Sequence, residues 1–232
     1  MSVSACCLKG FEWEGTPSGR TAKLAKNDVY IAGDNPDVAI IIIHDLLGWT
    51  FPNLRLPADH YAREANATVY IPDFFGGEVL PLEPILKGEW EKLDIRGFVG
   101  RNDREIRDPE IFDCARVLRE NYKKVGVGHQ PPLVDCIMVG HPSLLIEWDI
   151  DEIAVPVQIL APEHDPMYTT ELKRYTFNTL SRLGVPFDHQ HYPGVEHGCL
   201  ARGDSNKAGE REAMARGKNA AVSWFTQWLH QS

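Results

Sequence analysis

The sequence lacks any apolar run long enough to cross a bilayer. Its longest run, residues 38–43, is far shorter than the ~20 residues that a spanning helix needs. It also lacks an excess of positive charge, because 24 Lys and Arg face 33 Asp and Glu and the net charge is −9. That balance argues against nucleic acid or an anionic membrane as the main partner. Residues 1–10 have no basic start followed by an apolar core, so we expect no secretory signal.

Cysteine is scarce and odd in number, with five residues at positions 6, 7, 114, 136 and 199. Their spacing forms no disulfide framework, which is typical of a reducing compartment, so we predict a cytoplasmic protein. The adjacent Cys6 and Cys7 could bind a metal or oxidise, but the spacing does not favour it. We therefore predict neither a metal nor a cofactor.

What the sequence does contain is an alternation of buried strands and amphipathic helices. With 232 residues and 43% apolar side chains, it can bury the core of one α/β domain over residues 1–232. Continuous apolar runs predict strands covered on both faces, hence a largely parallel sheet. Residues 4–20 read as a polar arm. Predicted strands are 26–32, 38–43, 68–71, 125–127, 133–139, 155–160 and 187–192; predicted helices are 54–65, 108–122, 169–183 and 210–230.

Residues 78–108 are charged and irregular, and we interpret them as a lid or insertion that is partly helical. Trp90 and Phe98 are its expected points of attachment to the core. Asp108 followed by Pro109 matches an N-cap and a first helical residue, which predicts a helix that begins there and runs to Tyr122.

His197 is the leading candidate for chemistry. It lies in the glycine-flanked segment 194–198, between a predicted strand and the last helix. An imidazole with an ordinary pKa near ~6.5 serves as both base and acid at neutral pH. Asp165 follows another predicted strand and is placed to orient that imidazole. Together the two residues make two thirds of a hydrolytic triad.

Six segments spread over nearly the whole chain carry a family pattern. They are 10–17 (GFEWEGTP), 44–49 (HDLLGW), 72–77 (PDFFGG), 141–143 (HPS), 162–166 (PEHDP) and 194–198 (GVEHG). With these segments the chain resembles the dienelactone hydrolase family, in particular its fungal members. The resemblance implies an α/β-hydrolase fold with a mostly parallel central sheet flanked by helices. It also implies hydrolysis of a small-molecule ester or lactone by a Cys-Asp-His triad without a cofactor.

The resemblance assigns roles to four positions, and Trp49 is a further candidate for contact with a ligand. Asp165 and His197 match the acid and base of the family. Arg202 resembles an arginine used near the substrate carboxylate. Asp45 lies in the loop that offers a carboxylate and an oxyanion-hole amide, and Trp49 of the same loop is expected to contact the ligand.

The nucleophile of the family is absent. Its Cys stands in a Gly-x-Cys-x-Gly elbow, a strained strand-to-helix turn, and neither that pattern nor Gly-x-Ser-x-Gly occurs in this chain. The elbow is expected after residues 125–127, where only residues 128–132 precede the next strand. Adjacent parallel strands need a crossover of a dozen or more residues. We therefore expect a fold whose central βα unit, the nucleophile elbow, is depleted.

Three residues are possible substitutes for the nucleophile. Ser143 lies just past a strand end, near the expected crevice, but a serine there usually caps a turn, and we favour that role. Cys199 is two residues from His197, too close along the chain to face it, so packing is favoured. Cys136 alternates with core residues on a buried strand, where thiols are inert.

Other histidines have structural explanations. His189 and His191 share one strand face and, with Asp188 or Glu163, could bind metal, but no third ligand has a recognised spacing. A solvated strand face is favoured. His44 and His164 lie at strand ends, where backbone hydrogen bonds can satisfy them.

The sequence thus predicts a dienelactone hydrolase-like carboxylic ester hydrolase with little or no activity, because its nucleophile is missing. One alternative is a non-catalytic pseudoenzyme that binds a small molecule. Another is a truncated or mis-spliced form of an active hydrolase, since the flanks of the gap remain intact. The sequence leaves the oligomeric state open.

Overall fold

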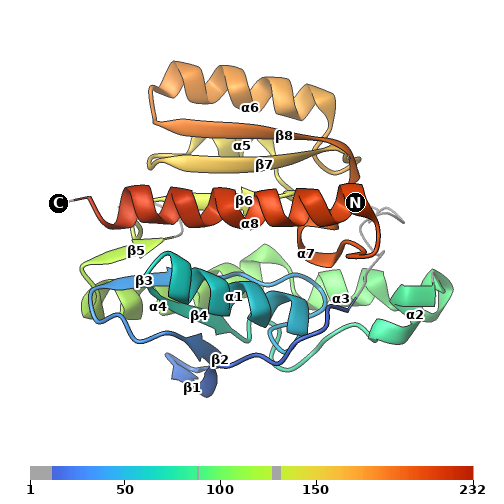
Figure 1. Ribbon diagram of the computed structural model, residues 1–232, viewed down its shortest axis with the longest axis horizontal. Coiled ribbons are helices and arrows are strands. Elements are labelled where there is room, and N and C mark those ends of the chain that lie inside the picture. Colours follow the sequence, from blue (N-terminus) through green and yellow to red (C-terminus); the bar gives the residue numbers. More distant parts are fainter. Residues whose placement is uncertain (1–11, 88, 127–131, 232) are drawn as a thin grey trace.

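The computed structural model describes residues 12–231 except for residue 88 and residues 127–131. Its strands form two sheets, with helices on both sides of each (Figure 1). In the first sheet the strand order is β1-β2-β4-β3-β5, with β3 parallel to β4 and β5 and the remaining pairs antiparallel. These strands are β1 (Arg20–Leu24), β2 (Asn27–Ala32), β3 (Val38–Ile41), β4 (Thr68–Pro72) and β5 (Lys124–Gly126).

The second sheet is wholly parallel, with the order β6-β7-β8. Its strands are β6 (Ile137–Gly140), β7 (Val157–His164) and β8 (Phe187–Glu196). The predicted α/β class with a mostly parallel sheet is confirmed. β1 was missed, because its exposed residues 20–23 give no apolar pattern.

Alternating side chains of β3 explain the two layers of helices. Ile40 points to one face, where it packs with Trp224 and Phe225 of α8 (Ala208–Leu229) and with α1 (Pro52–Glu64). Ile41 points to the other face, toward Leu118 of α4 (Arg104–Asn121). Because residues 38–41 are buried on both faces, the strand is continuously apolar, as the sequence predicted.

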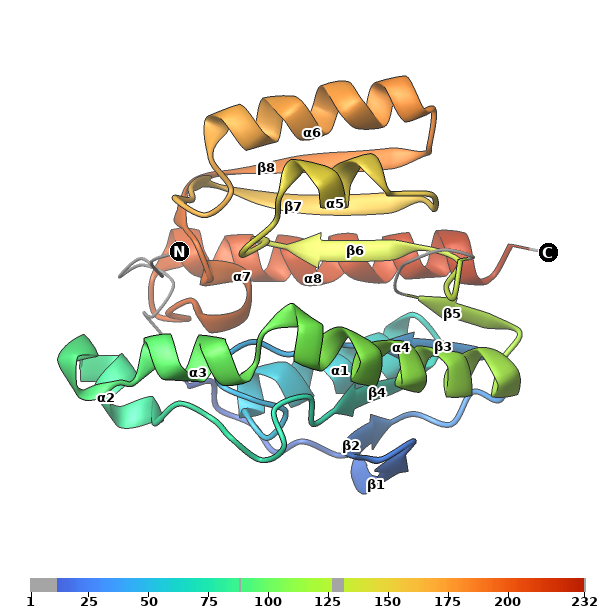
Figure 2. The same ribbon diagram turned by 180° about the vertical axis from the view of Figure 1, so that it is seen from behind.

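The second sheet is covered by α5 (Glu147–Asp151) and α6 (Thr170–Leu183) on one side and by α8 on the other (Figures 1 and 2). Thr169 caps α6, since its Oγ1 accepts a hydrogen bond from Leu172 N at 3.3 Å. Gly184 ends the helix with φ of 71°, a conformation that favours glycine. This helix has the predicted bounds to within one residue.

The predicted start of the helix near residue 108 was wrong. α4 begins at Arg104, and its cap is Asp103, whose Oδ1 accepts from Glu105 N at 3.2 Å. Pro109 therefore lies inside the helix, where it cannot donate to the carbonyl of Glu105. Ion pairs help this first part of the helix, including a two-bond pair between Arg104 and Asp149 of α5 at 2.8 and 3.1 Å.

The segment before α4 contains three short helices, in keeping with the prediction of a partly helical insertion. Phe98 is 4% exposed and anchors the segment against Phe75, with ring centroids 5.0 Å apart. The side chain of Trp90, the other predicted anchor, lies outside the described ones. The helices are α2 (Leu82–Lys87), η2 (Trp90–Lys92) and α3 (Ile95–Arg101).

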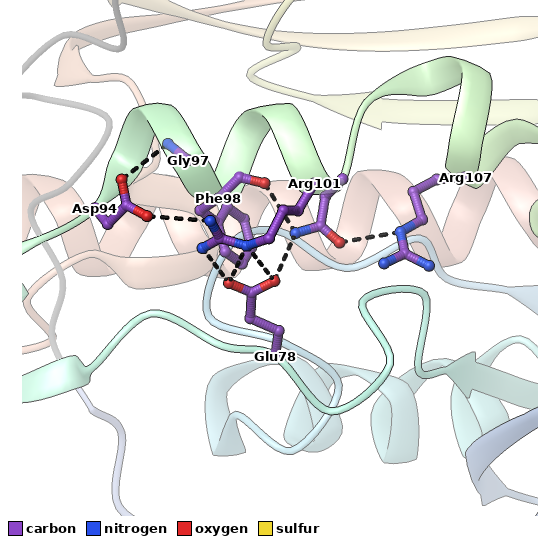
Figure 3. A network of polar contacts seen from close by, with 7 residues as sticks. Glu78, Asp94, Gly97, Phe98, Arg101 and Arg107 are labelled. Carbon is purple, nitrogen blue, oxygen red and sulfur yellow. Dashed lines mark hydrogen bonds and ion pairs between the residues drawn. The ribbon is translucent and has the colours of Figure 1, made fainter.

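A polar network fastens the same segment (Figure 3). Arg101 donates to both carboxylate oxygens of Glu78, with Nη2 at 2.6 Å from Oε1, and its Nη1 donates to Asp94 at 3.1 Å. Asn102 donates to Glu78 at 3.3 Å and accepts from Arg107 Nε at 3.0 Å. The network joins Glu78, which precedes the three short helices, to Arg107 of α4, which follows them.

β5 and β6 belong to different sheets, as the short connection between them required (Figure 2). Asp135 bridges the two edges: its backbone N donates to Val125 O at 2.5 Å, and its Oδ2 accepts from Val125 N at 2.8 Å. Arg119 Nη1 also donates to Oδ2, at 2.7 Å. A side chain thus replaces part of a strand ladder. No helix among the described residues is long and apolar enough to cross a membrane.

Candidate active site

Three polar side chains meet where the three strands of the second sheet end. Ser143 follows β6, Asp165 follows β7 and His197 follows β8. Because the strands are parallel neighbours, their carboxyl ends share one edge, the usual place of a ligand crevice. Ser143 Oγ lies 3.2 Å from His197 Nε2, and His197 Nδ1 lies 2.8 Å from Asp165 Oδ1.

The turn that carries Ser143 is strained on both sides. His141 has φ of 40° and Leu144 has φ of 58°, a left-handed conformation that residues with side chains seldom adopt. The start of the turn is fixed, because His141 N donates to Leu160 O at 2.9 Å and Pro142 is buried. Strain of this kind costs about 1–3 kcal/mol per residue and is often kept at functional sites. Here it accompanies a serine that faces His197.

Asp165 is built to stay ionised. Its Oδ1 accepts from His197 and from the backbone N of Met167 and Tyr168, at 2.9 and 3.0 Å. Burial alone would raise the pKa of this carboxyl, but those hydrogen bonds outweigh it and hold the pKa below its ordinary value. Asp165 therefore accepts a hydrogen bond from Nδ1 of His197, and this nitrogen carries the ring proton. In that tautomer Nε2 carries no proton and can accept the hydroxyl of Ser143.

His141 packs edge-on against His197, with ring centroids 5.1 Å apart and an angle of 72° between the rings. The pKa of His141 is lowered to about 3, chiefly by burial and also by the nearby His197 and Arg202, while Asp165 opposes them. His141 is therefore neutral at working pH. It supports one side of the His197 ring without adding a positive charge.

Arg202 and Asp45, both predicted to bind substrate, come together. Arg202 Nε lies 3.4 Å from Asp45 Oδ2, and the arginine is 5% exposed. Its guanidinium folds over Gly198, where a Cβ would lie 2.5 Å from Nη2, and Gly198 has φ of 84°. Only glycine suits that position. The residue after His197 thus fixes both the turn and the place of the arginine.

The short helix α7 (Cys199–Arg202), which carries Arg202, is tied to the N-terminal segment. Trp13 Nε1 donates to Gly203 O at 2.9 Å, and Trp13 N donates to Asn53 Oδ1 at 2.7 Å. Asn53 in turn donates to Ala201 O at 3.2 Å. Sequence reasoning did not assign these supports, although Trp13 lies in the family-like segment 10–17.

Trp49 does not join this group. Its ring packs beneath the guanidinium of Arg55, 4.8 Å from the ring centroid, and against the core between α1 and α8. These contacts bury part of the ring. That Trp49 contacts a ligand stays a prediction.

The described cysteines are core residues. Cys114, Cys136 and Cys199 are at most 6% exposed, and burial raises the pKa of each thiol to about 12. A thiol that stays protonated is a poor nucleophile. The packing roles predicted for Cys136 and Cys199 are confirmed. Cys6 and Cys7 lie outside the described residues.

The remaining histidines differ in their surroundings. His44 is satisfied by backbone, as predicted: Nε2 accepts from Phe74 N at 3.0 Å and Nδ1 lies 2.9 Å from Asp45 O. His191 is exposed, but His189 is half-buried and bonds Tyr168 at 3.3 Å, so the shared face is only partly solvated. Within the described part of the chain, no three His, Cys, Asp or Glu are grouped to hold a metal ion.

The expectation that Ser143 caps a turn gives way to a different contact. Its hydroxyl faces His197, and the strain at positions 141 and 144 could not be read from residue types. The only sequence signal was the position of Ser143 after a strand end, next to those of Asp165 and His197.

Comparison with solved structures defines the class of fold. A putative dienelactone hydrolase from Klebsiella pneumoniae superposes with a TM-score of 0.70 over 91% of this chain and 99% of that chain, at 13% identity. A dienelactone hydrolase from Anabaena variabilis does so with a TM-score of 0.61 at 12% identity, covering 92% of this chain and 98% of that one. The chain therefore has the α/β-hydrolase fold.

Sequence comparison defines the family. The model of the dienelactone hydrolase family matches residues 125–229. A carboxymethylenebutenolidase homolog of Mus musculus is 30% identical over 243 residues, covering 96% of both chains. The hydrolase tropI of Talaromyces stipitatus is 29% identical over 253 residues, covering 100% of this chain and 98% of its own. This chain belongs to the dienelactone hydrolase family.

Proposed function

We propose that this protein hydrolyses carboxylic esters or lactones with Ser143 as nucleophile, His197 as base and Asp165 as the group that orients it. One observation carries the proposal: Ser143 Oγ, His197 and Asp165 form a line with contacts of 3.2 and 2.8 Å. Those distances lie in or near the range of a nucleophile and base before substrate binds.

The steps follow from that line. His197 Nε2 accepts the proton of Ser143 as Oγ bonds to the carbonyl carbon, and the carbonyl oxygen becomes an oxyanion. When the tetrahedral intermediate collapses, the ester C–O bond breaks and the leaving alkoxide takes the proton from Nε2. His197 Nε2 then takes a proton from water as the water oxygen bonds to the acyl carbon, and it delivers that proton to Ser143 Oγ as the C–Oγ bond breaks and the acid leaves. Asp165 stabilises the imidazolium that forms in each half.

The proposed serine stands one strand away from the family position. The family thiol follows the strand equivalent to β5, whereas Ser143 follows β6, the next strand toward Asp165 and His197. The donor just after the family nucleophile is lost with the elbow. Loss of one oxyanion donor costs about 10²–10³-fold in turnover, so we expect slow hydrolysis.

The proposal includes a setting for this reaction. The substrate is a small ester or lactone whose polar end approaches Arg202 and Asp45, and residues 78–108 act as a lid on a single domain. The location is the cytoplasm, in agreement with the free thiols of the described cysteines.

The missing elbow favours a second function, which is binding of a small molecule without turnover. In that case Asp165 and His197 only hold a turn, and the chain is a pseudoenzyme or a form of an active hydrolase from which an internal segment has been excised. A chain that lacks a helix over the sheet exposes apolar surface there, and this loses about 25 cal/mol of stability per Å² exposed. We therefore expect the excised form to melt without a cooperative transition.

A fluorophosphonate probe tests the proposal, because it phosphonylates a serine only where a base activates it. We expect intact-mass analysis to show one adduct and peptide mapping to place it on Ser143. Ser143→Ala and His197→Ala should abolish the adduct while both variants melt cooperatively. An adduct elsewhere, or none on a well-folded wild type, leaves binding without turnover as the better account.

A further inference from the structure

A cavity of about 300 Å³ lies between β8 and the C-terminal half of α8. It is remote from Ser143, because Asp188 lines it near the start of β8 and His197 follows the end of that strand. The strand between them spans roughly 30 Å at about 3.3 Å per residue. The cavity is therefore separate from the candidate active site.

The carboxylate of Asp188 is held in place by two amide side chains. Gln158 Nε2 and Gln190 Nε2 both donate to Oδ2, at 2.9 and 2.8 Å. Gln158 faces Asp188 directly across the β7–β8 pairing. Within the described ranges no hydrogen bond reaches the other oxygen, Oδ1. The carboxylate is thus oriented through one oxygen, which leaves the other to accept from a ligand.

A buried acceptor beside the cavity lacks a partner. Gln158 is 2% exposed, and its Nε2 also donates to Ala220 O at 3.3 Å, but no described residue bonds its Oε1. An unpartnered buried acceptor is rare, which indicates that a donor from a ligand completes Oε1. The Nε1 atoms of Trp224 and Trp228 are also without described partners, but they are donors, so a ligand that only donates leaves them unchanged.

The walls of the cavity are aromatic and carry no positive charge. Trp224 and Trp228 lie with their ring centroids 5.5 Å apart, and Phe187 lines the same space. Neither lysine nor arginine is among the described lining residues. An aromatic wall beside a carboxylate attracts an organic cation through the ring face and the charge together.

We propose that this cavity binds a small planar organic cation of the amidinium or guanidinium class. One N–H of the ligand donates to Asp188 Oδ1 and a second N–H donates to Gln158 Oε1, while the flat part of the ligand lies against the indole rings. The volume, at the lower end of small-molecule sites, suits a ligand of one ring.

Benzamidine is the probe, and neutral benzamide is its matched control, because the two differ in charge but hardly in shape. Calorimetric titration of the full chain should show one benzamidine site with a dissociation constant at least tenfold lower than that of benzamide. Asp188→Asn should remove this preference. Asp28→Asn, which makes the same change of charge at an exposed position of β2, should keep it.

Two further variants keep the test decisive if Asp188→Asn folds poorly. Trp224→Phe and Trp228→Phe should each weaken benzamidine binding, and indole N–H resonances of these residues should shift on titration of wild type. Ser143→Ala should bind benzamidine as wild type does. Equal affinity for benzamidine and benzamide, or binding unchanged by all three variants of the cavity, would overturn the proposal.

Discussion

Ser143 Oγ and His197 Nε2 lie 3.2 Å apart although 54 residues separate them along the chain. They come from β6 and β8, with β7 and its Asp165 between them. The relationship depends on the second sheet alone, in which all strands are parallel and intact. The place of His197 and Asp165 therefore does not depend on how β5 connects to β6.

Asp165→Asn should reduce turnover of an ester substrate by about 10⁴-fold, because an amide at this position does not hold His197 with its proton on Nδ1. The change in melting temperature should be small beside that loss, since Asn can still accept from the backbone N of Met167 and Tyr168. Steady-state kinetics and a thermal melt of the same preparation measure the two effects.

Glu163→Gln is the matched control for this variant. Glu163 is exposed and accepts from Gly194 N at 2.7 Å, two residues from Asp165 in sequence. Its variant should retain turnover within a few-fold. Equal losses in the two variants would mean that the loop, and not the Asp165–His197 pair, controls activity.

His141→Phe should make the protein less sensitive to acid. In the folded protein the pKa of His141 is about 3. In the unfolded chain the same imidazole has its ordinary pKa of 6.5, so it binds a proton as soon as the pH falls below that value. The unfolded state thus gains protons first, and stability is lost as pH falls from about 6.5 toward 3. Phenylalanine keeps a ring against His197 and removes this loss.

Urea denaturation at pH 7 and pH 4.5 measures the difference. Wild type should lose more free energy of unfolding between the two values than His141→Phe, by on the order of 1 kcal/mol. The neighbours Asp165, His197 and Arg202 are present in both proteins, so the comparison isolates the imidazole of His141. Identical losses would show that His141 is protonated alike in both states.

Asp135→Asn should destabilise the protein by about 1–3 kcal/mol, because the carboxylate accepts from Val125 N and from Arg119. This residue joins the facing edges of the two sheets. Asp113→Asn, on an exposed ion pair with Arg116 of the same helix, should cost less than about 1 kcal/mol. Chemical denaturation of both variants gives the comparison, and equal costs would argue that Asp135 is not a structural link.

Much of the fold was predictable because its signals are local. The buried strand at residues 38–41 is continuously apolar, and α6 has a threonine cap and a glycine stop. The start of α4 was not, because two aspartates five residues apart, Asp103 and Asp108, both resemble caps, and only the contact with α5 favours Asp103. The sequence also showed that β5 and β6 could not be adjacent parallel strands.

The candidate site was predictable only in part. Asp165 and His197 follow strands and carry the right chemistry, so their pairing could be inferred. The approach of Ser143 depends on left-handed φ at His141 and Leu144, which residue type disfavours. The packing of Trp49 on Arg55 could not be read from its place in a crevice loop, and its contact with a ligand stays a prediction.

The most direct test of the account is hydrolysis of a p-nitrophenyl ester by purified wild type, Ser143→Ala and Ser143→Cys. We expect slow but saturable turnover by wild type, loss of at least 10²-fold in kcat for Ser143→Ala with KM little changed, and partial activity for Ser143→Cys. Equal kcat in wild type and Ser143→Ala, with both folded, would contradict the assignment of Ser143 as nucleophile.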